Sequence, residues 1–321
     1  MNKKIKKTLF IILPIALGVF LIWMYISKFT DEQLDEIVYN MKNANYWWIL
    51  ASLFFGILSH LSRAYRWHFM LEPLGYKPKF TNSIMAVLLA YLLNLVVPRS
   101  GEVARAATLA KYEDVPFEKG FGTIVAERIS DVIMLLIILG IVFFYQTDLI
   151  LSYFSGVDPT KKIITIVLII VFFTIGIKLI KKSTNQFLVK VKTFFNGLVE
   201  GIASIFKMKK KWAFIFHTIF IWLMYIAMFW AVTFTIPETS HLSFEAILVG
   251  FIAGAVAMSI TNGGFGAYPV FVASALALYG IKDEAGASFG LLMWTSQTIM
   301  VLTFGGLSLL ILPIYNKDKE I

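Results

Sequence analysis

The sequence contains no cysteine, and this absence excludes disulfides, thiolate metal sites and cysteine nucleophiles. Charged residues are also scarce, at 15% of the 321 residues, where a typical soluble domain has about 25%. The four histidines lack metal-ligand spacing, and no Ser-His-Asp set can be proposed from the sequence. We therefore predict no catalytic residues, no bound metal and no cofactor, and expect that the protein is not an enzyme.

Apolar residues are abundant instead, at 58% of the chain, with a mean hydropathy of +0.76. Crossing a bilayer takes about 20 apolar residues. The stretches that meet this length are 8–27, 46–68, 121–145, 161–180, 212–234 and 286–313. We interpret the first as a retained transmembrane helix, because it is too long for a signal-peptide core and no small-residue cleavage site follows it.

The distribution of charge predicts which side of the membrane each loop occupies. The net charge of +9 comes from lysines that cluster beside apolar spans, as the positive-inside rule expects, so we predict no nucleic-acid partner. The basic N-terminus and the lysine-rich region 178–211 are then cytoplasmic, and the acidic segment 28–45 is external. Residue 79 and the start of the span 121–145 are both predicted on the cytoplasmic side, so the segment 80–120 must cross the membrane an even number of times. This favours a re-entrant hairpin that enters from the cytoplasm. The stretch 244–280 is either a second hairpin or two short spans.

These patterns predict an all-α polytopic membrane protein with about six full spans plus two re-entrant or broken-helix hairpins. The order of spans and hairpins is the same in both halves but the orientation is opposite, so an inverted repeat, an arrangement common in secondary transporters, is open as an interpretation. We expect the two hairpins to meet within the membrane. The predicted parts of a single membrane domain, 1–321, are a first repeat 1–145, an external loop 146–160, a second repeat 161–313 with a cytoplasmic amphipathic linker 183–206, and a cytoplasmic tail 314–321.

The first hairpin carries a charged motif, Asn94-x3-Pro98-Arg99-x-Gly101-Glu102-x2-Arg105. Pro98 disfavours helix at the residue before it and so ends the incoming leg, while Gly101 permits a turn. The start of the returning helix supplies free N–H groups, and Arg99 beside it suits a phosphate. The alternative is a structural pair, in which an arginine of this motif, which includes Arg105, and Glu102 only hold the hairpin together.

A second motif, Glu127-Arg128-x2-Asp131, lies near the start of the next span. Arg128 neighbours Asp131 at the i, i+3 spacing of a helix. The three arginines and three carboxylates of the two motifs balance, so a neutral buried cluster is expected. Arg63 and Arg66 on the second span add positive charge that suits an anionic headgroup, unless both side chains extend to the cytoplasmic interface.

The third candidate is the glycine-rich segment that interrupts 244–280, with Asn262, Gly263, Gly264 and Gly266. Glycines allow close approach of backbone to a ligand or to another helix, and the sequence leaves both readings open. Several tryptophans at span ends, including Trp47 and Trp67, match the interfacial aromatic belts of membrane proteins.

The motif NxxxPxRxGExxR followed by ERxxD resembles the signature of the flippase-like transmembrane-region family of lysylphosphatidylglycerol synthases, over roughly residues 45–313. The resemblance implies a membrane module without the soluble domain that makes aminoacyl-lipid. It also implies a polar core made of Arg99, Glu102, Arg105, Glu127, Arg128 and Asp131. The family's second motif commonly has the form PxxGGxGxxE, whereas this chain has Ile260 and Pro269 at the outer positions, so the resemblance does not extend to a mechanism that uses that acid.

We expect a protein of the cytoplasmic membrane that translocates or binds an anionic or polyprenyl-phosphate-type lipid, with both termini in the cytoplasm. Its expected partners are membrane lipids, and a second copy of the chain or a lipid-synthesising enzyme is a further candidate. Two alternatives stay open. One is an intramembrane transferase acting on a lipid-linked headgroup, with one of the motif carboxylates as general base. The other is an ion-coupled transporter of a small solute.

Overall fold

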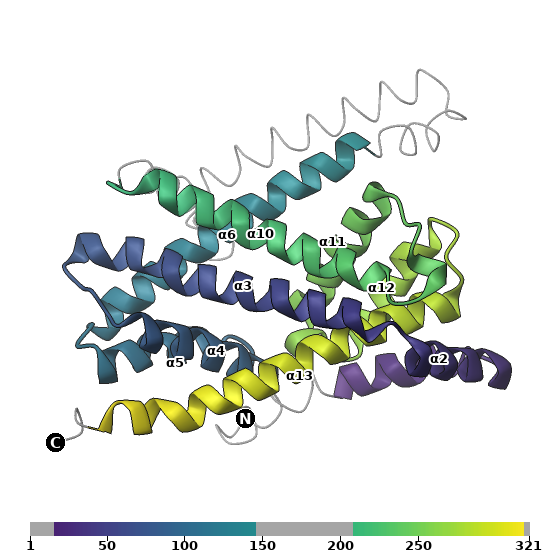
Figure 1. Cartoon of the computed structure of the whole chain (residues 1–321), viewed down its shortest axis with the longest axis horizontal. Helices are drawn as coiled ribbons and strands as arrows, with labels where there is room; N and C mark the ends of the chain where they lie inside the picture. The colour runs from purple at the N-terminus through teal and green to yellow at the C-terminus, as the bar shows by residue number, and fades with distance from the viewer. Residues whose placement is uncertain (1–15, 146–207, 318–321) are drawn as a thin grey trace, which may run out of the picture. The chain divides into compact units, whose positions relative to one another are not determined.

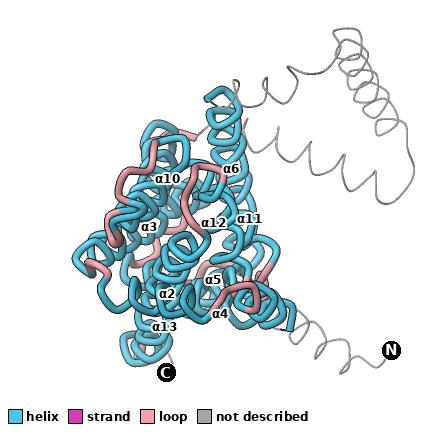
Figure 2. The backbone as a smooth tube through the Cα atoms, turned by 90° about the vertical axis from the view of Figure 1, so that its right-hand side faces the viewer, coloured by secondary structure: helices cyan, strands magenta, loops and turns pink. Residues whose placement is uncertain are grey.

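The structure is a computed structural model that describes residues 16–145 and 208–317. These residues form helices joined by loops, without strands, which confirms the all-α prediction (Figure 2). The chain divides into two compact units, one of Met1–Val125 with Trp212–Ile321 and one of Ala126–Lys211. The predicted external loop 146–160, span 161–180 and linker 183–206 lie outside the described residues.

Three described helices are long and apolar enough to cross a membrane, namely α6 (Phe117–Tyr145), α10 (Lys211–Thr233) and α13 (Asp283–Tyr315). They coincide with three of the predicted spans. Of the first predicted span, 8–27, the described part is the apolar helix Ala16–Ile26. Two short 3-10 helices, η1 (Glu72–Leu74) and η2 (Pro237–Thr239), complete turns after α3 and α10.

The acidic segment treated as a loop in the sequence forms a helix, α2 (Asp31–Asn43). A capping box explains its start, because the side chains and backbone N–H groups of Thr30 and Gln33 bond reciprocally. The following helix α3 (Tyr46–Leu71) contains the predicted span 46–68. The axes of α2 and of the helical segment Tyr46–Leu74 differ by 71°, so the chain turns sharply between them.

The first predicted hairpin consists of two helices that pack against each other, α4 (Phe80–Val96) and α5 (Ser100–Tyr112). The break falls at Pro98, as the sequence predicts, since the preceding Val97 has extended backbone with φ −129° and ψ 119°. Both helices have fewer residues than the about 20 that a full span needs. Their lengths and mutual packing support the hairpin.

The second hairpin consists of α11 (Phe244–Ile260), the 3-10 turn η3 (Asn262–Gly264) and α12 (Ala267–Ala277). α11 and α12 pack against each other. With 11 residues, α12 rises only about 16 Å, which is roughly half of the hydrocarbon thickness. These lengths favour a hairpin over two short spans.

Helix α13 runs along both hairpins, packing on α12 toward one end and on α4 toward the other (Figure 1). Two glycines allow these close crossings. A Cβ on Gly290 would lie 2.7 Å from the Cα of Pro269 in α12, and one on Gly305 would lie 2.6 Å from the Cβ of Leu92 in α4. Glycine at these positions therefore lets a single helix support both hairpins.

The tips of the two hairpins are in contact, as expected from the sequence. The side-chain amide of Asn262 donates to the backbone oxygen of Val96 at 3.4 Å. A Cβ on Gly263 would lie 2.4 Å from Cδ2 of Leu95, so the glycine backbone packs directly on the end of α4. Segments separated by more than 160 residues thus form one junction.

Candidate functional site

The tip of the first hairpin presents Arg99 at the N-cap of α5, where its own side chain makes no capping hydrogen bond. The cap is supplied from α4 instead, because Asn94 Oδ1 accepts the Gly101 N–H at 2.8 Å. The Ser100 hydroxyl donates to the backbone oxygen of Leu93 at 3.0 Å and further fastens the turn. Asn94 of α4 therefore caps the start of α5, the returning helix of the hairpin.

Two backbone N–H groups at the start of α5 already have acceptors within the hairpin. The Ser100 N–H donates to Val97 O at 3.2 Å, and the Gly101 N–H donates to Asn94. For these two groups, the prediction that the helix start supplies free N–H groups to an anion is therefore wrong.

Arg99 is the side chain placed to contact an anion at this tip. It is exposed, and no hydrogen bond or ion pair joins it to the parts of the chain that are described. Its backbone is left-handed, with φ 61°, which costs a non-glycine residue about 1–2 kcal/mol. Such strain persists only where the surroundings impose it, and strained residues concentrate at functional sites.

Arg105 lies in a different environment, 2% exposed and stacked over the ring of Trp67 on α3 at 3.9 Å from the centroid. The indole N–H donates to the Thr123 hydroxyl at 2.8 Å. Trp67 is thus completely buried, and its assignment to an interfacial belt is wrong, whereas Trp47 is 79% exposed. The cation–π contact fixes α5 against α3.

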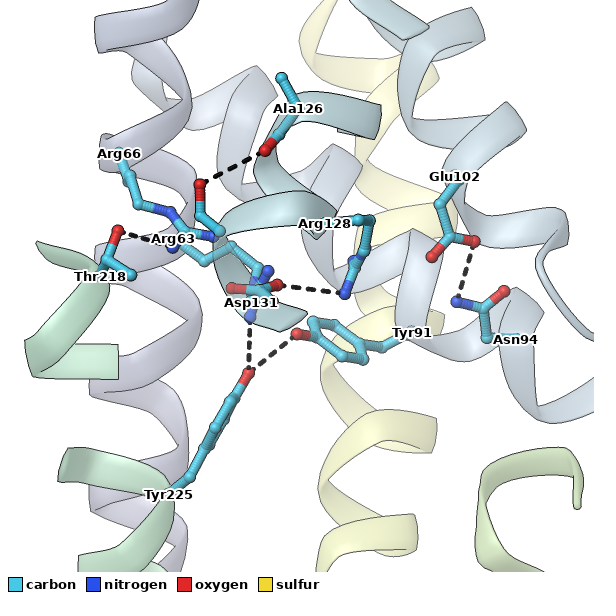
Figure 3. A network of polar contacts seen from close by, with 11 residues as sticks. Arg63, Arg66, Tyr91, Asn94, Glu102, Ala126, Arg128, Asp131, Thr218 and Tyr225 are labelled. Atoms are coloured by element: carbon cyan, nitrogen blue, oxygen red, sulfur yellow. Dashed lines mark hydrogen bonds and ion pairs between the residues drawn. The ribbon is translucent and has the colours of Figure 1, made fainter. Parts of the chain in front are cut away.

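Arg63 and Arg66 are also buried, with 3% and 0% of their surface exposed, so the alternative that they extend to the interface is wrong. The Arg63 guanidinium donates to the Tyr225 hydroxyl at 3.2 Å, and Arg66 donates to the Thr218 hydroxyl at 2.9 Å. Both acceptors belong to α10, as Figure 3 shows. The two arginines therefore direct positive charge into the packing between α3 and α10.

The second motif lies in the other compact unit and is described by itself. Arg128 and Asp131 form the predicted i, i+3 ion pair, with 3.4 Å between Nη1 and Oδ2. Glu127 is completely buried and Asp131 is 9% exposed. The predicted pairing within this helix is confirmed, while the joining of the two motifs into one neutral cluster stays a prediction.

The glycine-rich turn of the second hairpin serves close packing. A Cβ on Gly266 would lie 2.0 Å from the backbone oxygen of Gly18 in the helix Ala16–Ile26. The Gly263 oxygen accepts a hydrogen bond from the Trp294 indole at 2.9 Å. Gly264 has φ +79°, which glycine adopts without strain. The sequence allows these glycines to approach either a ligand or another helix, and the contacts support packing against other helices.

Two polar groupings escaped the sequence analysis. At the open end of the first hairpin, the amides of Asn82 and Asn316 bond reciprocally at 2.8 Å, and Asn82 also donates to Glu113. Nearer the tip, the hydroxyls of Tyr91 and Tyr225 are 3.1 Å apart. Tyr91 lies three residues before Asn94, on the same side of α4, and this spacing is the one signal that points to it.

The site is thus rich in hydrogen-bond donors, with an exposed guanidinium at the hairpin tip and three buried ones within the same compact unit. In the described parts of the chain, no group of His, Asp and Glu residues is arranged to hold a metal ion. The exposed guanidinium of Arg99 suits an anionic oxygen, above all the oxygens of a phosphate, which arginine binds with two parallel hydrogen bonds.

Comparison with known proteins gives distant relatives. A UPF0104 membrane protein of Methanocaldococcus jannaschii is 25% identical over 97% of this chain and 97% of its own length. A UPF0104 membrane protein of Pyrococcus horikoshii is 25% identical over 52% of this chain and 50% of its own length. The glycosyltransferase AglD of Haloferax volcanii is 26% identical over 34% of this chain and 18% of its own length. No solved structure matches the chain.

The family model described as the lysylphosphatidylglycerol synthase TM region matches residues 11–305. This range includes both hairpins and both charged motifs. Together with the apolar helices, the match makes the chain a multi-pass membrane protein, and the chain belongs to the family of the lysylphosphatidylglycerol synthase TM region.

Proposed function

We propose that this protein binds an anionic phosphate-bearing lipid at the tip of its first hairpin and moves the headgroup across the cytoplasmic membrane. The family name links the fold to proteins that handle phosphatidylglycerol, whose headgroup carries a phosphate. The charge distribution favours cytoplasmic termini. A second copy of the chain or an enzyme that synthesises the lipid is the expected protein partner.

The observation that carries the proposal is the exposed Arg99 on a strained turn. Arg99 follows the end of α4, where Val96 contacts the second hairpin, and Asn94 accepts the Gly101 N–H in the same turn. A hydrogen bond to a charged group contributes about 1.5–3 kcal/mol, so one bidentate contact would account for selective capture of a phosphate headgroup. The lipid chains can remain in the bilayer while only the headgroup enters the protein.

Arg99→Ala is expected to slow headgroup transfer about ten-fold or more, because it removes the charged contact. The assay uses purified protein in phosphatidylcholine vesicles that contain fluorescent phosphatidylglycerol, and follows chemical quenching of the label in the outer leaflet. Arg99→Lys should retain part of the rate, since lysine keeps the charge and loses the bidentate fork. Lys77→Ala, which removes an exposed cation from a loop, should leave the rate unchanged.

Arg99→Gly distinguishes the contribution of the guanidinium from that of the backbone conformation. Glycine adopts a positive φ without strain, so this variant keeps the turn and loses only the side chain. Equal loss in the Gly and Ala variants assigns the effect to the guanidinium. Undiminished transfer by folded Arg99→Ala would disprove the role of this residue.

A second candidate is an intramembrane transferase acting on a lipid-linked headgroup, favoured by the partial similarity to a glycosyltransferase. The buried Glu127 and the half-buried Glu102 would then be candidates for a general base. Incubating the purified protein with a lipid-linked sugar donor distinguishes the two functions. A covalently changed lipid supports the transferase, whereas transfer of an unchanged lipid between leaflets supports translocation.

A further inference from the structure

The contact between α3 and α13 brings polar side chains together within the larger compact unit. Gly56 of α3 marks the contact, because a Cβ there would lie 3.2 Å from Sδ of Met300 on α13. Ser52 and His60 lie one turn before and one turn after Gly56 on the same face of α3. Gln297 lies one turn before Met300 on α13. We call Ser52, His60 and Gln297 the crossing group.

The crossing group contains polar atoms that are buried and unbonded. Ser52 is 0% exposed and His60 is 6% exposed. Among residues 16–145 and 208–317, neither Ser52 Oγ nor His60 Nδ1 has a hydrogen-bond partner, and the same holds for the buried Nε2 of Gln297. Leaving a buried polar group unsatisfied is costly and rare in proteins. Three such atoms around one helix contact therefore indicate a polar ligand.

The chemistry of the crossing group favours an alcohol as this ligand. A serine hydroxyl donates and accepts, an imidazole nitrogen does one or the other according to its tautomer, and a carboxamide presents both functions. An alcohol hydroxyl also donates and accepts, so it can bond to all three side-chain types. An anionic oxygen only accepts, and neither Ser52 nor Gln297 offers it a charge.

The crossing group lies beside both hairpins. The indole of Trp294, one turn before Gln297 on α13, donates to the backbone oxygen of Gly263 in the turn of the second hairpin at 2.9 Å. On the other side, the ring of His60 lies 4.4 Å from the ring of Tyr91 on α4, which belongs to the first hairpin. A headgroup held between the hairpins would therefore meet these three side chains.

We propose that Ser52, His60 and Gln297 form a subsite for hydroxyl groups of the lipid headgroup, so that the substrate is a phospholipid whose phosphate carries a polyol such as glycerol or a sugar. This inference rests on the proposed function, in which Arg99 binds the phosphate. A phosphate contact alone does not distinguish such a lipid from phosphatidic acid. A site that hydrogen-bonds a hydroxyl does, because it discriminates against an analogue that lacks the hydroxyl.

The test measures which lipid the purified protein retains in detergent, using native mass spectrometry. The probe is an equimolar mixture of phosphatidylglycerol and phosphatidic acid with the same acyl chains. Wild-type protein should retain about ten-fold more phosphatidylglycerol than phosphatidic acid, the effect of one or two added hydrogen bonds. Ser52→Ala combined with Gln297→Leu should bring this ratio close to one and leave the retention of phosphatidic acid unchanged.

His60→Phe is a second, independent variant, because phenylalanine keeps a ring against Tyr91 and removes the ring nitrogens. It should lower the ratio about three-fold or more, the effect of losing one hydrogen bond. Equal retention of the two lipids by wild-type protein would overturn the subsite. A wild-type ratio in both the double variant and His60→Phe would overturn it as well, with size-exclusion profiles showing folded protein.

Ser296→Ala is the matched control for packing. Ser296 is a buried serine of α13, 8% exposed, but its hydroxyl already donates to the backbone oxygen of Met293 at 2.9 Å. This variant should keep the wild-type ratio. A loss as large as that of the double variant would overturn the subsite, because the effect would then come from repacking of α13 and not from an unbonded polar atom.

Two further arms separate the source of the hydroxyl and the link to translocation. Displacement of phosphatidylglycerol but not of phosphatidic acid by added glycerol would support the subsite and assign it to a free polyol, whereas resistance to glycerol would assign it to the headgroup. Arg99→Ala should lower the retention of both lipids equally, since both carry the phosphate. If wild-type protein transfers no lipid in vesicles, the proposed function fails, and the retention ratio still decides whether the subsite exists.

Discussion

Replacing Gly101 with alanine is expected to prevent the first hairpin from closing. A Cβ at this position would lie 2.1 Å from the backbone oxygen of Ala90 and 2.8 Å from the side-chain nitrogen of Asn94. The Ala90 oxygen belongs to the backbone of α4 and cannot rotate away as a side chain can, so α4 and α5 must separate. We expect a loss of about 3 kcal/mol or more in the free energy of unfolding, which is the upper end of the cost of overpacking. Headgroup transfer should fall with it, because Arg99 depends on this turn.

The matched control is Gly122→Ala in α6, where a Cβ would meet no atom within 4 Å. Alanine is the better helix former by about 1 kcal/mol, so this variant should be as stable as wild type or slightly more stable. Melting in detergent, followed by size-exclusion chromatography, compares the two variants directly. Equal melting temperatures for Gly101→Ala and wild type would contradict the close crossing of α4 and α5.

The sequence was sufficient to locate the elements that depend on local chemistry. The break at Pro98 follows from the restriction that proline places on the residue before it, and the Arg128–Asp131 pair follows from helix geometry. The apolar helices α10 and α13 follow from composition alone. In each case the cause and the effect lie within a few residues, so no knowledge of tertiary structure is needed.

The remaining features depend on residues that only the fold brings together. The sequence places Asn94 in the motif of the first hairpin, but its role as the cap of α5 requires the hairpin to be closed. The partner of Arg63 on α10 is 162 residues away, and the partner of Asn82 at the C-cap of α13 is 234 residues away. Trp67 has the position of an interfacial residue, yet the stacking of Arg105 buries it. The sequence therefore predicts which charged residues belong to the candidate site, but it does not predict which residues they contact.

The second hairpin offers the other large effect, because its glycine-rich turn lies directly against the first described helix. Gly266 has φ +73°, and a Cβ on it would lie 2.0 Å from the backbone oxygen of Gly18. Gly266→Ala therefore adds a backbone clash to the cost of placing alanine in a sparsely populated φ/ψ region, which is about 1–3 kcal/mol. We expect the free energy of unfolding to fall by more than about 3 kcal/mol. We also expect the helix Ala16–Ile26 to lose its contact with the turn.

Gly280→Ala isolates the contribution of that contact. Gly280 also has a positive φ, +79°, but a Cβ there would meet no atom within 4 Å. Its replacement should cost only the backbone strain, so the difference between the two variants measures the clash with the first helix. A shared melting temperature for the two variants would mean that the helix Ala16–Ile26 does not rest on the turn. A lower melting temperature for Gly266→Ala would instead make this helix a support of the second hairpin, and through the Asn262–Val96 contact a support of the tip that carries Arg99.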